Sequence, residues 1–184
     1  MALTATVRRF EIALADSDRG RYDPLDLRVA QHPSESDRYL VARVVARALE
    51  DADGVDFSRG LAADDEPALW QRDLRGDLQA WIEIGAPAAD RLHKASKSGA
   101  RIVVYGWRQL EALAAELTER AVHRAADIEL FALDPDFLDA VAATLERNNR
   151  WDLSVAGGTV YLATGRGQHE TAVTRIPVVG ARSM

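Results

Sequence analysis

The residues with the clearest chemical potential form an ordered series of carboxylates followed by a lysine. Asp64, Asp65 and Glu66 stand together, Glu83 follows inside the apolar run LQAWIEIG, and Lys94 comes after it. Magnesium prefers carboxylate oxygen ligands, and a nearby lysine can position a water molecule and offset charge on a phosphate. This is the chemistry of phosphodiester hydrolysis, with Mg²⁺ as the predicted cofactor.

Each of these residues also has a purely structural interpretation. Glu83 is costly to bury alone, so an ion pair with Arg91, Lys94 or an arginine of the first helix would serve in place of a metal. The acidic cluster suits the start of a turn or helix, where carboxylates are favoured. Lys94 and Lys97 are the only lysines in the chain, but a solvated position on a helix is the ordinary role for both.

The composition predicts a folded chain without cysteine chemistry. Hydrophobic residues make up 47% of the 184 residues and charged residues 28%, and the absence of cysteine excludes disulfides, thiolate zinc sites and cysteine nucleophiles. A formal net charge of -6 argues against tight nonspecific nucleic-acid binding but allows a local basic groove. No apolar run reaches the length of about 18 residues that a membrane span needs. We therefore expect one cytoplasmic domain over residues 1–184 without membrane contact.

Hydrophobic periodicity predicts strands followed by alternating strands and helices. Residues 1–31 alternate in polarity on both sides of a polar turn, which predicts an antiparallel hairpin. Ser34 is the expected N-cap of the first helix, with Glu35 in its first turn. The other predicted elements are strand 55–58, a turn or short helix over 68–76, strand 78–85, helix 88–98, strand 101–107, helix 109–124, strand 128–133, helix 135–147, strands 151–155 and 159–163, and strand 171–178. The alternating middle part predicts a parallel crossover core.

Several uncommon strings occur in an order that resembles the YaeQ family of small bacterial proteins. They are AQHPSESD at residues 30–37, GLAADDEPALWQ at 60–71, WIEIGAP at 81–87, RLHKA at 91–95 and DPDFLDAVAATLERN at 134–148. The resemblance covers nearly the whole chain. It implies an α/β fold that is a variant of the PD-(D/E)XK, or restriction-endonuclease-like, fold, with a mixed central sheet flanked by helices, an N-terminal β-hairpin and C-terminal strands.

The resemblance also implies a nuclease-like site, with one departure from the pattern. In such nucleases an acidic residue precedes a strand that carries Glu-x-Lys, whereas here Glu83 is followed by Ile84 and Gly85. Because glycine holds the lysine position, Lys94 on the next helix would have to send its long side chain back to the same cleft. We therefore predict that Asp65 and Glu83 hold the metal and act in catalysis together with Lys94. The auxiliary residues of this prediction are Glu35, Asp64, Glu66 and Arg91.

Three functional hypotheses remain open at this point. The first is a divergent Mg²⁺-dependent nuclease that binds nucleic acid through a local groove. The second is a catalytically inactive binding or regulatory module that keeps the nuclease fold and contacts a protein partner, because a fold does not guarantee its chemistry. The third is a structural cluster of ion pairs at Glu83 that binds no ligand.

Overall fold

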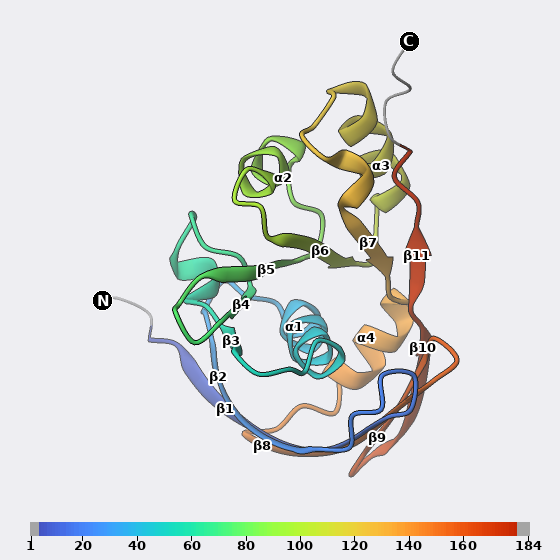
Figure 1. Cartoon of the computed structure of the whole chain (residues 1–184). Helices are drawn as coiled ribbons and strands as arrows, with labels where there is room; N and C mark the ends of the chain where they lie inside the picture. The colour runs from blue at the N-terminus through green and yellow to red at the C-terminus, as the bar shows by residue number, and fades with distance from the viewer. Residues whose placement is uncertain (1–3, 180–184) are drawn as a thin grey trace.

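Over residues 4–179, which the computed structural model describes, the chain forms two β-sheets, four α-helices and two short 3₁₀ helices (Figure 1). The strands are β1 (Thr6–Asp16), β2 (Pro24–Gln31), β3 (Val55–Phe57), β4 (Leu69–Arg72), β5 (Leu78–Ile84), β6 (Arg101–Gly106), β7 (Glu129–Ala132), β8 (Asn148–Ala156), β9 (Thr159–Thr164), β10 (Gly167–Ala172) and β11 (Thr174–Ile176). The helices are α1 (Asp37–Leu49), α2 (Ala89–Ser96), α3 (Leu110–Glu119), α4 (Pro135–Ala142), η1 (Gly60–Ala62) and η2 (Ala125–Asp127).

These elements stack in four layers. Sheet A, in the order β10-β9-β8-β1-β2, curves beneath α1 and α4, and sheet B, in the order β11-β7-β6-β5-β4-β3, covers the same two helices from the other side (Figure 1). The helices α2 and α3 pack against the opposite face of sheet B. The larger core therefore lies between the sheets, where Phe10 and Trp151 of sheet A meet edge to face with ring centroids 4.9 Å apart.

Sheet A confirms the predicted hairpin and adds an unexpected parallel strand. β1 and β2 pair antiparallel, with Thr6 opposite Gln31, while the first three residues of the predicted hairpin lie outside the described residues. β8 pairs parallel to β1 on its other side, with Arg9 opposite Asn148. The predicted mixed sheet flanked by helices corresponds to sheet B, whereas the union of the hairpin and the C-terminal strands in a second sheet was not predicted; the α/β class with mixed sheets is confirmed. β8 joins sheet A because its strict alternation of buried and exposed residues suits a sheet with one face in the core.

Sheet B contains the predicted crossover core. β5, β6 and β7 are parallel neighbours connected through α2 and α3. Residues 69–72, within the stretch predicted as a turn or short helix, instead form β4, which pairs antiparallel with β5 and places Trp70 opposite Trp81. This short segment becomes a strand because the neighbouring β5 offers it a paired edge and a core for Leu69, which no local pattern encodes.

The first helix begins later than predicted. Its N-cap is Ser36, whose hydroxyl accepts a hydrogen bond from the backbone N–H of Tyr39 at 3.2 Å, so Ser34 lies outside the helix. Glu35 therefore precedes the N-cap, and its carboxylate closes the preceding turn by accepting from the backbone N–H of His32 at 3.1 Å. Among the described residues, no helix is both long and apolar enough to cross a membrane.

Gly106 at the end of β6 allows the strands beneath the candidate site to approach closely. A Cβ atom there would lie 2.4 Å from the carbonyl oxygen of Gly85 and 3.0 Å from a methyl carbon of Leu110. We expect Gly106→Ala to lower the free energy of unfolding by about 1–3 kcal/mol, because backbone atoms must shift to accept the methyl group. Urea denaturation measures this change. The control is Gly165→Ala, where the added Cβ would meet no atom within 4 Å, and equal loss in both variants would contradict the prediction.

Candidate functional site

Glu83 lies on β5 and faces the helical layer of α2. Alternation along the strand sends Ile82 and Ile84 into the core between the sheets, while Trp81 packs on the α2 side. Glu83 shares the face of Trp81, and only 5% of the residue is exposed. A carboxylate buried this deeply requires hydrogen bonds and a compensating charge.

Both requirements are met by nitrogen donors that converge on one carboxylate oxygen. The Glu83 Oε1 atom accepts a hydrogen bond from the indole nitrogen of Trp81 at 2.7 Å and from Nε of Arg91, on α2, at 2.6 Å. Burial raises the pKa of the Glu83 carboxyl, and the hydrogen bond and charge of Arg91, followed by the Trp81 hydrogen bond, oppose that rise. Glu83 and Arg91 therefore form a largely buried ion pair.

Arg91 uses its two remaining nitrogens to hold the acidic loop. Its Nη1 atom donates to the backbone carbonyl of Asp64, and its Nη2 atom donates to the backbone carbonyl of Glu66. A guanidinium group is always charged and offers several donors in a rigid plane, which lets it bridge three acceptors at once. One guanidinium thus supplies positive charge to a cluster of three oxygen atoms, which come from Glu83, Asp64 and Glu66.

The acidic loop approaches Glu83 through its backbone, while its own carboxylates lie elsewhere. The side chains of Asp64 and Asp65 are exposed. Glu66 instead pairs with Arg59, whose Nε and Nη2 atoms lie 2.9 and 2.7 Å from Oε1, and this hydrogen bonding lowers the pKa of Glu66. Within the described part of the chain, no three His, Cys, Asp or Glu side chains are grouped so that they could hold a metal ion. The predicted Mg²⁺ ligands, Asp65 and Glu83, therefore belong to no such group among the described residues.

Arg91, rather than Lys94, provides the positive charge at Glu83. Lys94 is exposed one turn further along α2, and it forms no ion pair with any of the described residues. The glycine at the lysine position has a backbone reason, because Gly85 has φ of 89°, a left-handed conformation that favours glycine. A Cβ at Gly85 would itself have room, lying 3.9 Å from Trp107 and 4.0 Å from Tyr39.

A second buried acid and arginine pair lies beside α1. Nη2 of Arg43 donates a hydrogen bond to Oε2 of Glu35 at 3.0 Å. Nε of Arg43 lies 3.0 Å from Oε1 of Glu35, which is an ion-pair contact without the alignment of a hydrogen bond. Burial raises the pKa of Glu35, against the charge of Arg43. Arg43 also donates to the carbonyl of Ala30 at 2.9 Å. Glu35 is therefore engaged in a structural ion pair that joins α1 to the turn before it, and the bond to Ala30 joins α1 to β2.

Sequence reasoning missed Tyr39 and Trp81 as parts of this region. Burial, together with the negative charges of Glu83 and Glu35, raises the pKa of Tyr39 to about 12. Tyr39 therefore lies within the electrostatic reach of both buried carboxylates. Trp81 had a sequence signal, because it stands two residues before Glu83 on the same face of β5, whereas Tyr39 had none that pointed to Glu83.

The fold and the site together define a class of α/β protein. It has two mixed sheets, and one of them carries a buried glutamate paired with an arginine. The chain belongs to the YaeQ family, because the family model described as YaeQ protein matches residues 1–173.

Relatives and solved structures agree with this assignment. An uncharacterized protein YaeQ of Escherichia coli strain K12 is 28% identical over 175 residues, covering 95% of this chain and 97% of the relative. The crystal structure of a YaeQ protein from Xanthomonas axonopodis pv. citri has a TM-score of 0.86 at 36% identity and covers 96% of this chain and 100% of that one. The crystal structure of YaeQ protein from Pseudomonas syringae has a TM-score of 0.86 at 32% identity and covers 97% of this chain and 98% of that one.

The raised pKa of Glu83 predicts a specific pH dependence of stability. Because the folded state binds the Glu83 proton more tightly than the unfolded state, the contribution of this group to stability falls as pH rises from about 4.5 through its folded pKa. Wild type should therefore lose stability relative to Glu83→Gln across that range, as measured by urea unfolding at a series of pH values.

The control variant is Glu66→Gln, for which the opposite sign is expected. Because the pKa of Glu66 is lowered in the folded state, this group contributes stability that is present above its unfolded pKa and is lost as pH falls through its folded pKa. If the free energies of unfolding of wild type and Glu83→Gln differed by a constant amount from acidic to neutral pH, burial would not be the dominant influence on the pKa of Glu83.

Proposed function

We propose that this chain is a binding or regulatory protein that does not hydrolyse phosphodiesters, built on a variant of the restriction-endonuclease-like fold. The fold relationship is supported by sheet B, a mixed sheet with helices on both faces, in which an acidic loop precedes β4 and β5 carries Glu83. The observation that carries the functional proposal is the guanidinium of Arg91, which occupies the oxygen cluster formed by Glu83, Asp64 and Glu66.

The difference between a guanidinium and a magnesium ion is what decides the chemistry. Magnesium lowers the pKa of a bound water and keeps positions open for water and phosphate oxygens. A guanidinium only donates hydrogen bonds, and it cannot be deprotonated in a protein. Arg91 therefore compensates the charge of Glu83 without creating a nucleophile.

The same contacts give the acidic loop a defined conformation. Arg91 fixes two of its carbonyls, and Arg59 fixes the side chain of Glu66. The exposed carboxylates of Asp64 and Asp65 are thereby presented on a restrained segment, which reduces the entropy that a partner must overcome on binding. This arrangement supports a binding role.

A Mg²⁺-dependent nuclease with Asp65, Glu83 and Lys94 is the second candidate. The observation in its favour is that, among the described residues, Arg91 alone ties the loop that carries Asp65 to Glu83, so that displacement of Arg91 by substrate and metal would free both. Nucleic acid is the partner in that case.

Titration calorimetry with Mg²⁺ and Mn²⁺ separates the two candidates. We expect wild type and Glu83→Ala to show the same heats, without a saturable site, because Arg91 already supplies the positive charge. We also expect no cleavage of single-stranded or double-stranded DNA or RNA in the presence of either metal. Saturable metal binding that disappears in Glu83→Ala, together with cleavage by wild type, would establish the nuclease instead.

Removal of Arg91 should destabilise the fold because it leaves Glu83 buried without a counter-charge. We expect Arg91→Ala to lower the free energy of unfolding by about 3 kcal/mol at neutral pH, and Arg91→Lys to lose less because it keeps the charge but not the three-way bridge. Urea denaturation measures both changes. The control is Arg59→Ala in the same loop, whose side chain is 68% exposed and which should change little. Similar stability of Arg91→Ala and wild type would contradict a compensating role.

A further inference from the structure

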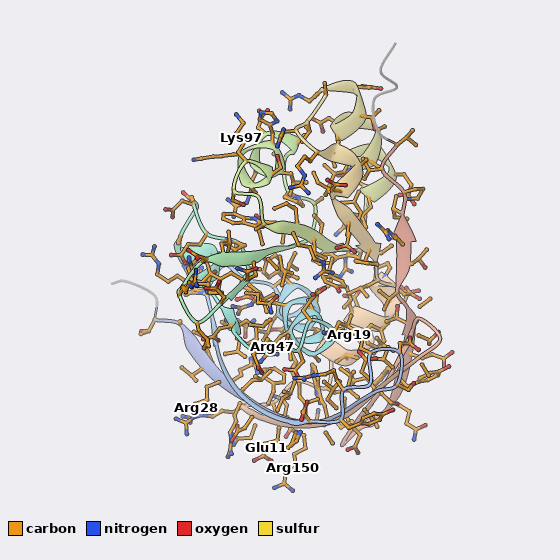
Figure 2. All side chains as sticks on the ribbon, in the orientation of Figure 1. Glu11, Arg19, Arg28, Arg47, Lys97 and Arg150 are labelled. Carbon is orange, nitrogen blue, oxygen red and sulfur yellow. The ribbon has the colours of Figure 1, made fainter. Side chains whose placement is uncertain are left out.

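Within residues 4–179, no helix covers the outer face of sheet A. The helices α1 and α4 lie on its inner face, and α2 and α3 pack on sheet B (Figure 1). Outward positions of β1, β2 and β8 carry charged side chains, of which Glu11, Arg28 and Arg150 project away from the core (Figure 2). A groove of about 570 Å³ lies on this face, bounded by β1, β8 and the turn between β9 and β10.

Three arginines and two glutamates line this groove, and the carboxylate of Asp26 beside it accepts two hydrogen bonds from Arg9. Arg9, Arg150 and Arg166 line it together with Glu11 and Glu146. Arg150 is 89% exposed and is held only through Nε, which donates to Glu11 at 2.9 Å. Both terminal nitrogens of Arg150 therefore remain without a hydrogen bond to the described residues and are available to an anion.

The wall of the groove is held in a fixed conformation by Asn149, a residue that is only 6% exposed. Its amide nitrogen donates to the carbonyls of Glu146 at 2.9 Å and Arg9 at 3.2 Å, and its Oδ1 atom accepts from the backbone N–H of Glu146 at 2.9 Å. These bonds join the turn before β8 to β1. Because the wall is built before any ligand arrives, little ordering is required on binding.

From this geometry we propose that the groove binds a small molecule that carries a phosphate or pyrophosphate group. Its volume lies within the range of about 300–1,000 Å³ that is usual for small-molecule sites. Arg150, on a strand, and Arg166, in a turn, line the same groove from different elements, and the tetrahedral oxygens of a phosphate suit donors from different directions better than the planar oxygens of a carboxylate do. This site is on the other sheet from Glu83 and does not rest on the proposed function.

The carboxylate of Glu146 already pairs with Arg166, so it would compete with a bound phosphate for this arginine. Their Nη2 and Oε1 atoms are 2.5 Å apart, and both side chains are largely exposed. A bound phosphate would take the place of this carboxylate at Arg166. Removal of the Glu146 charge should therefore strengthen anion binding, whereas removal of the arginines should weaken it.

Titration calorimetry with pyrophosphate as the probe tests the proposal on the full chain. We expect saturable binding by wild type, a loss of affinity of at least about tenfold in the double variant Arg150→Ala/Arg166→Ala, and tighter binding by Glu146→Gln. The matched controls are Arg75→Ala/Arg175→Ala, which removes one exposed arginine from the turn between β4 and β5 and one from β11, and Glu170→Gln, which neutralises an exposed acid on β10 outside the groove. Both controls should bind as wild type does.

The other outcomes are equally informative. Absence of saturable pyrophosphate binding by wild type, or equal changes in the groove variants and their controls, would overturn the proposal. A short oligothymidylate that displaces pyrophosphate would support the site and identify a nucleic-acid phosphate as a source of the group. Binding of the oligothymidylate alone, without pyrophosphate binding, would overturn the proposal of a small-molecule site.

Discussion

A carboxylate buried beneath a helix must be given a counter-charge, and the Glu83 region is built around the arginine that supplies it. Arg91 can reach Glu83 only because α2 packs across the face of β5 that carries the carboxylate. Its other two nitrogens then fix the carbonyls of Asp64 and Glu66. Helix docking, the acidic loop and the protonation of Glu83 are thereby linked through one guanidinium, so a change in any of them affects the others.

A second arginine, Arg43, lies close to the beginning of the same loop. Arg43 pairs with Glu35, and its Nη1 atom lies 3.4 Å from the position that a Cβ of Gly60 would occupy. The segment between η1 and β4 thus begins near Arg43 and is bonded to Arg91 at Asp64 and Glu66. Each of these arginines also compensates a buried carboxylate, Arg43 that of Glu35 and Arg91 that of Glu83.

The two sheets separate the two regions that we consider functional. Sheet B positions the Glu83 site between its strands and α2, whereas sheet A carries an uncovered face with an arginine groove. The core between them consists of apolar side chains from both sheets and from α1 and α4. With this packed layer in between, the groove and the glutamate site share none of the contacts described above, and their chemistry can be altered independently.

The sequence by itself determined the elements whose periodicity is strong, and the order of the site residues. The N-terminal hairpin and the strands and helices of the crossover core follow from local alternation and helical spacing, and the apolar neighbours of Glu83 indicated that its carboxylate would be buried. Only the tertiary structure decided that β8 joins β1, that residues 69–72 form a strand, and that Arg91 rather than Lys94 meets Glu83. Strand partners and the direction of a long side chain depend on segments distant in the sequence, so no local pattern specifies them.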